Sequence, residues 1–156
     1  MANTYTQLFI QFVFAVQNRR CSIKLNWEDD LYKYINGIIL KNGHKLYCIN
    51  GMPDHIHILV SMNPTQSPSD LMYHVKRSSS MWINKHKLTK VHFSWQDGFG
   101  AFSLGKAQLQ EKIRYIENQK EHHKVVSFRE EYVRFLEEYD IQYDERYIFK
   151  PLDENE

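Results

Sequence analysis

Two histidines separated by one residue lie in a segment with the pattern of a β-strand, Pro53–Val60. Because strand side chains alternate between the two faces, His55 and His57 project from one face at a spacing of roughly 7 Å. Ile56 and Ile58 then point to the opposite, buried face. Neutral imidazole nitrogens bind divalent cations, so this pair could supply two ligands of a metal site. The alternative is a pair of histidines that only pack.

Tyr115 and Gln119 are four residues apart in a segment with helical periodicity, which places a phenol and an amide on one helix face. A phenol with a pKa near 10 attacks poorly at neutral pH unless a cation activates the electrophile, as it does by neutralising a phosphate oxygen. Gln119 could offer its carbonyl oxygen to that cation. Taken separately, the two residues could equally be a core tyrosine and a solvent-facing glutamine.

The hydrophobic pattern predicts the elements that position these residues. Alternation predicts strands, and apolar residues at helical spacing predict helices. Asn26 is the predicted cap of the first helix and Ser67 of the second, the latter with proline at the first helical position. The predicted elements, in chain order, are a strand over 5–17, a helix over 26–42, a strand over 44–50, the histidine strand, a helix over 67–87, a short strand over 98–103, and helices over 106–123 and 128–139.

This order of strands and helices is typical of an α+β fold with a ferredoxin-like antiparallel sheet. One sheet face, rich in apolar residues, is expected to pack on helices. The other face, with Gln7 or Gln11 and the two histidines, is expected to be free to hold a site. At 156 residues the chain has the size of one domain, which we place at residues 1–150, followed by a polar tail over 151–156.

Charge is distributed unevenly along the chain. Residues 1–96 hold 11 Lys/Arg and 5 Asp/Glu, a formal charge of +6, whereas residues 97–156 hold 9 and 14, a charge of −5. No acid occurs between Leu71 and Gln96, where basic and aromatic residues alternate in a way that suits a nucleic-acid backbone and stacked bases. A solvated helix face is the plainer interpretation. The candidate DNA contacts are Tyr73, Lys76, Arg77, Asn84 and Lys85.

The sequence has neither the roughly 20 consecutive apolar residues of a membrane span nor the charged start and cleavage site of a signal peptide. We therefore expect a cytoplasmic protein with no membrane partner. Cys21 and Cys48 are too few for a disulfide scaffold and are expected to be reduced.

Four motifs, in this order and spacing, resemble those of the single-tyrosine HUH transposases of the smallest bacterial insertion sequences. This is the TnpA type, in the superfamily of REP-associated tyrosine transposases. The resemblance covers nearly the whole chain and is carried by residues Met52–Val60, Trp95–Ser103, Tyr115–Gln119 and Tyr143–Tyr147.

The resemblance implies the HUH single-strand nuclease fold and a homodimer that binds hairpins in single-stranded DNA. It implies His55, His57 and Gln119 as ligands of Mg²⁺ or Mn²⁺, with Tyr115 as the nucleophile. Tyr115 would attack a phosphodiester to give a 5′-phosphotyrosine and a free 3′-hydroxyl, and a hydroxyl would later rejoin the strand. In this family the nucleophile helix can dock on the partner subunit, so composite active sites are possible.

Two other functions remain open at this point. One is a non-catalytic module that binds single-stranded nucleic acid, and the other is a domesticated endonuclease that cleaves repeat hairpins of the host. A small zinc hydrolase is less favoured, because the sequence shows no nearby carboxylate or cysteine to complete a zinc triad.

Overall fold

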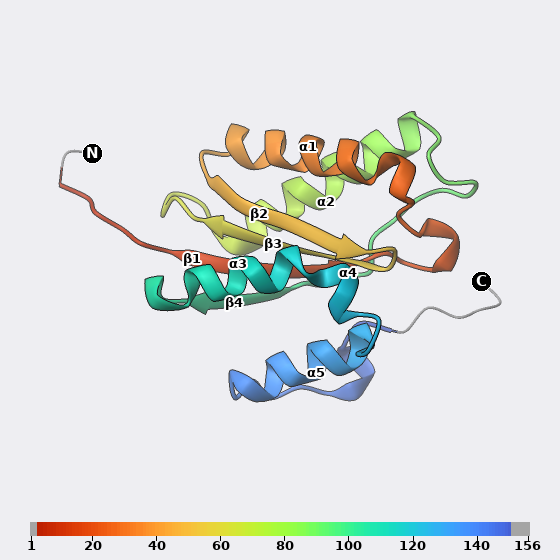
Figure 1. The fold of residues 1–156 in the computed structure, drawn as a ribbon. Helices are drawn as coiled ribbons and strands as arrows, with labels where there is room; N and C mark the ends of the chain where they lie inside the picture. The colour runs from red at the N-terminus through yellow and green to blue at the C-terminus, as the bar shows by residue number, and fades with distance from the viewer. Residues whose placement is uncertain (1–2, 151–156) are drawn as a thin grey trace.

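The computed structural model describes residues 3–150, which form a four-stranded antiparallel sheet with helices on both faces (Figure 1). The predicted α+β class with a ferredoxin-like sheet is confirmed. The strands and longer helices are β1 (Phe9–Ala15), α1 (Leu25–Lys41), β2 (Lys45–Met52), β3 (His55–Ser61), α2 (Pro68–Lys85), β4 (Gly100–Leu104), α3 (Leu109–Glu117), α4 (Gln119–His122) and α5 (Phe128–Glu138); three short 3₁₀ turns are η1 (Arg19–Cys21), η2 (Lys106–Gln108) and η3 (Glu145–Tyr147).

The strand order in the sheet is β2-β3-β1-β4, so the histidine strand β3 is central. β3 pairs with β1 on one side and with β2 on the other, and a two-residue turn at Pro53 and Asp54 closes the β2–β3 hairpin. The register sets Val13 opposite His57 and Ala15 opposite His55. Because β3 is flanked on both sides, the backbone positions of both histidines are fixed by two ladders of hydrogen bonds.

α1 and α2 cover one face of the sheet, drawn above it in Figure 1. The core between these two helices and the sheet contains the alternate strand residues that the sequence pattern assigns to this face. Among them are Phe12, Phe14, Ile56 and Ile58. All four side chains are fully buried. This large apolar core fixes which way each strand faces, and it therefore directs His55 and His57 to the other face.

The second face is not free, contrary to the prediction. α3, α4 and α5 cover it, below the sheet in Figure 1, and two further apolar clusters lie beneath them. One cluster joins Val13 and Phe102 of the sheet to Phe135 of α5, and the other joins Leu59 to Leu109 of α3. The histidine pair is consequently enclosed between the sheet and these helices.

Several element boundaries differ from their predictions. The first strand is shorter, and α1 begins at Leu25 with Lys24 at the N-cap, so the predicted cap at Asn26 is wrong. The predicted helix over 106–123 is interrupted, because α3 ends at Glu117 and Asn118 separates it from α4. The cap at Ser67 is confirmed, since its side chain accepts a hydrogen bond from the Asp70 backbone at 3.0 Å. The predicted tail over 151–156 lies outside the described residues.

Within residues 3–150, no helix is both long and apolar enough to cross a bilayer.

Candidate metal and nucleophile site

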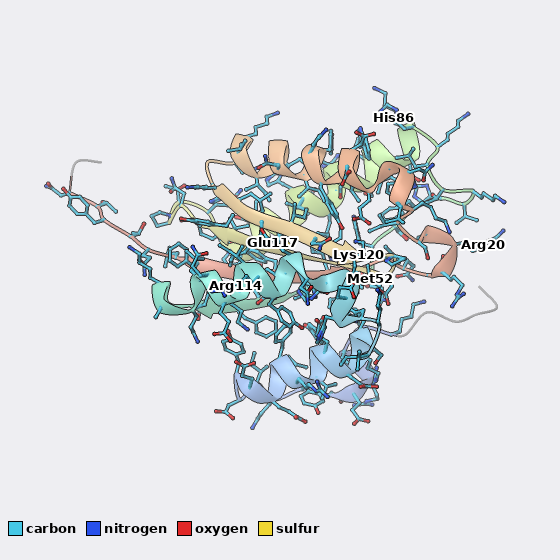
Figure 2. The ribbon with its side chains drawn as sticks, viewed as in Figure 1. Arg20, Met52, His86, Arg114, Glu117 and Lys120 are labelled. Carbon is cyan, nitrogen blue, oxygen red and sulfur yellow. The ribbon has the colours of Figure 1, made fainter. Side chains whose placement is uncertain are left out.

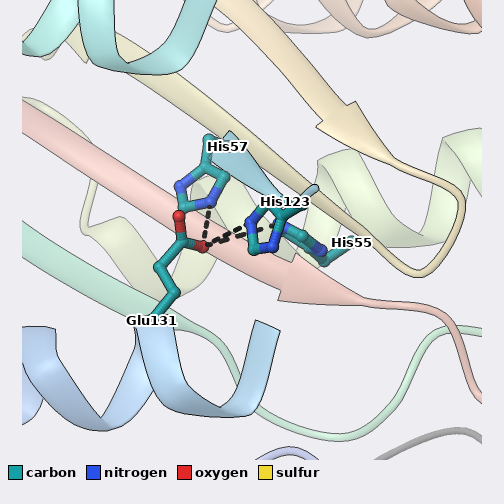
Figure 3. Close-up of side chains that lie close together, drawn as sticks. All are labelled: His55, His57, His123 and Glu131. Atoms are coloured by element: carbon teal, nitrogen blue, oxygen red, sulfur yellow. Dashed lines mark hydrogen bonds and ion pairs between the residues drawn. The ribbon is translucent and has the colours of Figure 1, made fainter. Parts of the chain in front are cut away.

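His55 and His57 lie side by side on β3, with their ring centres 5.1 Å apart and both side chains fully buried (Figure 3). They face α4 and α5, as the register of the sheet requires. The ring of His55 is stacked on Phe128 at the start of α5, with a centroid distance of 3.9 Å. The position of α5 and the orientation of this imidazole are therefore linked.

Each of the two rings has a polar neighbour at its Nδ1 atom. The Nδ1 of His55 lies 2.7 Å from Oδ1 of Asp54, the residue before it in the hairpin turn. The Nδ1 of His57 lies 3.0 Å from the side-chain amide of Gln11, which is 1% exposed on the neighbouring strand β1. In both rings the Nε2 atom is therefore the one directed into the site.

Two residues absent from the sequence prediction complete the cluster, His123 and Glu131. Oε1 of Glu131 lies 2.8 Å from Nε2 of His57, 3.2 Å from Nε2 of His123 and 3.6 Å from Nε2 of His55 (Figure 3). One ligand atom from each of the four residues lies within 4.8 Å of the others. Glu131 comes from α5, which Ser127 caps, and His123 from the segment directly after α4.

The sequence does contain a signal for Glu131. It lies three residues after Phe128 and four before Phe135, both of which are buried, so its carboxylate falls on the apolar face of an amphipathic helix. Glu130, one residue earlier, is exposed. A buried carboxylate at such a position needs partners. The expectation that no carboxylate lies near the histidines is wrong, because α5 folds back across the sheet.

These donors fit a divalent cation, since three imidazoles and a carboxylate are ordinary ligands of such ions. Although burial raises the pKa of the Glu131 carboxyl, its contacts with His123 and His57 lower it well below the ordinary value. Burial lowers the pKa of His57 to about 4 despite the nearby carboxylate. An ionised carboxylate beside a neutral imidazole is the protonation state that metal binding requires.

Tyr115 lies at the edge of this cluster. Its hydroxyl donates a hydrogen bond to Oε2 of Glu131 and lies 3.1 Å from Nε2 of His122. Burial raises the pKa of the phenol, and Glu131 raises it further. An open pocket of about 530 Å³ leads to the half-buried tyrosine and is lined by Arg114, Tyr115, Glu117, Asn118 and His122. The hydroxyl is therefore close to a proton acceptor, and solvent reaches its surroundings.

Gln119 is fully buried and contacts two members of the cluster, His55 and Glu131. Its Oε1 lies 3.1 Å from Nε2 of His55, and its Nε2 donates to Oε2 of Glu131 at 3.1 Å. The structure thus brings Tyr115 and Gln119 to the same carboxylate, although the helix is interrupted between them. The Gln119 carbonyl oxygen could also bind a cation at this position, and the Gln119 amide orients Glu131.

A separate set of contacts anchors the short helix α4 on the sheet. Nζ of Lys120 donates to Glu28 of α1 at 2.8 Å and to the carbonyl of Gly51 at 2.5 Å. The side chain of Asn50 donates to the carbonyl of Glu117 at 2.9 Å. Figure 2 shows Glu117 and Lys120 where α3 gives way to α4, beside Met52 at the end of β2. These bonds fix the backbone on both sides of Asn118.

The five predicted DNA contacts all lie on α2, across the sheet from the cluster (Figure 1). Tyr73 is 57% exposed, Arg77 donates to its hydroxyl at 3.0 Å, and Lys85 is exposed. Two others are engaged inside the protein. Lys76 donates to the carbonyls of Gln96 and Gly98, and both ends of the Asn84 amide bond the backbone of Phe93. Burial lowers the pKa of Lys76 to about 8.

The family described as "Transposase IS200 like" matches residues 4–119 of the chain. Among solved structures, a Deinococcus radiodurans protein provisionally designated a transposase shares 20% identity with a TM-score of 0.61, over 75% of this chain and 94% of that one. A REP-associated tyrosine transposase bound to a REP hairpin shares 16% identity with a TM-score of 0.60, over 80% and 73%. At these identities the two structures show a common fold. No curated protein matches the chain.

Proposed function

Because the chain belongs to the family of IS200-like transposases, we propose that it cleaves and rejoins single-stranded DNA with Tyr115 as nucleophile and a divalent cation as cofactor. One observation carries the proposal: the Tyr115 hydroxyl contacts Glu131, the carboxylate on which the buried histidines converge. His55, His57 and Gln119 are the proposed ligands of Mg²⁺ or Mn²⁺. When bound, such a cation neutralises charge on the scissile phosphate.

In the proposed reaction, the Tyr115 oxygen forms a bond to phosphorus while the phenolic proton passes to Oε2 of Glu131, with which it is hydrogen-bonded. The bond between phosphorus and the 3′ oxygen breaks, and that oxygen takes a proton from water. The products are a 5′-phosphotyrosine and a free 3′-hydroxyl. In the second step a 3′-hydroxyl attacks the phosphorus of the phosphotyrosine and gives its proton to water. The bond between phosphorus and the Tyr115 oxygen breaks, and Glu131 returns its proton to that oxygen.

Glu131 has a second role in this scheme, because its negative charge helps to raise the pKa of Tyr115. The raised pKa keeps the phenol protonated until substrate arrives. A protonated phenol is a poor nucleophile, so its proton must leave as the oxygen attacks, and Glu131 is the carboxylate that accepts its hydrogen bond. His122, 3.1 Å from the same oxygen, helps to orient it. Arg114 lines the pocket outside Tyr115 and is placed to attract a phosphate.

The proposed substrate is a hairpin in single-stranded DNA, and the proposed assembly is a cytoplasmic homodimer. Support for the hairpin comes from the REP-associated tyrosine transposase of similar fold, which was solved bound to a REP hairpin. Support for the dimer comes from the motif resemblance. Tyr115 already contacts Glu131 of its own chain, so the site as proposed does not need a residue from the partner subunit.

The test is cleavage of end-labelled single-stranded DNA taken from the flanks of the gene, with Mn²⁺ present. Tyr115→Phe is expected to lower cleavage by about 1,000-fold or more, because it removes the attacking oxygen. Tyr139→Phe is the matched control, because Tyr139 packs on Phe102 in the same helical layer. The Tyr139→Phe variant should cleave DNA at the wild-type rate. Cleavage by Tyr115→Phe at the wild-type rate would disprove the assignment. Binding without cleavage by the wild type would favour a non-catalytic module.

A further inference from the structure

We propose that His123 and Glu131 are metal ligands beside His55, His57 and Gln119, so that three imidazoles, one carboxylate and one amide oxygen hold the cation and the site prefers Mn²⁺ to Mg²⁺. This inference deepens the proposed function and rests on its metal site. Both residues lie beyond positions 4–119, where the family match ends.

The first observation is that each of the three imidazoles has an outer partner on Nδ1. These partners are the Asp54 carboxylate for His55, the Gln11 side chain for His57 and the Val126 carbonyl for His123, at 2.7, 3.0 and 2.6 Å. Metal-bound histidines nearly always have such a partner on the nitrogen that does not bind the metal, which fixes the ring and its tautomer.

The tautomers follow from these partners. A carboxylate and a carbonyl only accept hydrogen bonds, so the neutral rings of His55 and His123 carry their proton on Nδ1. Their Nε2 atoms then present lone pairs to the interior. Gln11 can serve His57 in the same way with its amide oxygen, because the two ends of an amide are interchangeable by rotation. All three inward nitrogens can therefore donate lone pairs to one cation.

The second observation is where these lone pairs point. The three Nε2 atoms converge on Oε1 of Glu131 at 2.8–3.6 Å, and the Gln119 carbonyl oxygen lies 3.1 Å from Nε2 of His55. The Nε2 of His123 is buried and makes no hydrogen bond, although it lies 3.2 Å from that oxygen. The contacts of His57 and His55 are hydrogen bonds only if Nε2 carries the proton. With the proton on Nδ1, their lone pairs face oxygens at these distances, and a cation between them would bind both.

The third observation concerns burial. The side chains of His55, His57, His123 and Glu131 are 0%, 0%, 5% and 2% exposed. Mg²⁺ prefers oxygen ligands and keeps several waters, whereas three of the donors here are imidazole nitrogens. Imidazole suits first-row transition ions, and Mn²⁺ also accepts carboxylate. The donor set therefore favours Mn²⁺.

The test is titration calorimetry of the metal-free protein with MnCl₂ and with MgCl₂, without DNA. We expect Mn²⁺ to bind at one site per chain at least about tenfold more tightly than Mg²⁺. His123→Ala and Glu131→Gln should each weaken Mn²⁺ binding by roughly 10-fold to 100-fold, the loss typical of damaged metal sites. His86→Ala is the control, because this histidine lies at the C-terminal end of α2, across the sheet from the cluster, and the variant should bind Mn²⁺ as the wild type does.

Absorption fine structure at the manganese edge of the wild type counts the imidazoles without any variant, and we expect three. A count of only two imidazoles on the manganese would overturn the inference. So would unchanged Mn²⁺ affinity in both His123→Ala and Glu131→Gln, or Mg²⁺ binding as tightly as Mn²⁺. Tighter binding in Glu131→Gln would also overturn it and would make Glu131 a plug of the site. Tyr115→Phe should bind Mn²⁺ normally, so loss of cleavage in that variant and loss of metal binding in the others are separate results.

Discussion

At the scale of single residues, the site depends on a close backbone approach in the hairpin that carries His55. A Cβ atom on Gly51 would lie 2.2 Å from the carbonyl oxygen of His55 and 3.0 Å from the Cα of Ile56. Both contacts are with backbone, which cannot move away as the end of a side chain can. Only glycine therefore fits at this position, and it couples the geometry of β2 to the first metal-ligand candidate.

We predict that Gly51→Ala destabilises the protein by about 1–3 kcal/mol, as other overpacked sites do, because the hairpin must shift to admit the methyl group. Urea denaturation measures this directly. Gly37→Ala is the control: Gly37 lies in α1 with nothing within 4 Å of its Cβ position, and alanine there should stabilise by about 0.5–1 kcal/mol. A Gly51→Ala protein as stable as wild type would refute the argument.

At the scale of elements, α4 positions Gln119 but has only four residues. Helices this short do not form by themselves in water, so its position must come from tertiary contacts. Lys120 supplies three of them, to Glu28, Asn50 and Gly51. Glu28 is 7% exposed, and Lys120 is its ion-pair partner.

We predict that Lys120→Ala lowers the free energy of unfolding by about 1–3 kcal/mol, because the buried carboxylate of Glu28 loses its partner. The same variant should slow DNA cleavage, since Gln119 is its neighbour. Lys124→Ala, which removes only an exposed pair with Glu121, should cost less than about 0.5 kcal/mol. Equal stability losses in the two variants would show that the Lys120 contacts do not anchor α4.

The same elements show what the sequence could and could not reveal. The alternation in β1 and β3 predicts the strand faces correctly, because a one-residue error would bury the wrong set of side chains. The break at Asn118 was not predictable from local pattern, because the apolar stripe of Leu109, Ile113 and Ile116 continues smoothly toward Gln119. Contacts with Asn50, which is distant in sequence, set the backbone there, because its side chain donates to the carbonyl of Glu117 and accepts from Lys120.

The candidate site was predictable only in part for a related reason. His55 and His57 share a face by the period of a strand, and Tyr115 and Gln119 were linked by helical spacing and by motif resemblance. His123 and Glu131 depend on how α5 folds back across the sheet, which no local pattern specifies. The available clue to Glu131 was its helical spacing from Phe128 and Phe135, which places it on the apolar face of α5.

At the scale of the whole molecule, the two sheet faces have different tasks. α1 and α2 form the main core on one face, and α3, α4 and α5 enclose the chemical groups on the other (Figure 1). The two parts of the chain differ in formal charge, which is +6 for residues 1–96 and −5 for residues 97–156. The acidic half supplies Glu131, while the basic half supplies α2 as a candidate DNA surface.

The most direct test of the whole account is mass spectrometry of the wild-type protein after incubation with single-stranded DNA from the flanks of its gene and Mn²⁺. We predict a covalent protein–DNA adduct whose tryptic peptide carries a 5′-phosphorylated nucleotide on Tyr115. A 5′-phosphonucleotide mapped to any other residue, or cleavage with no covalent intermediate at any time point, would contradict the account.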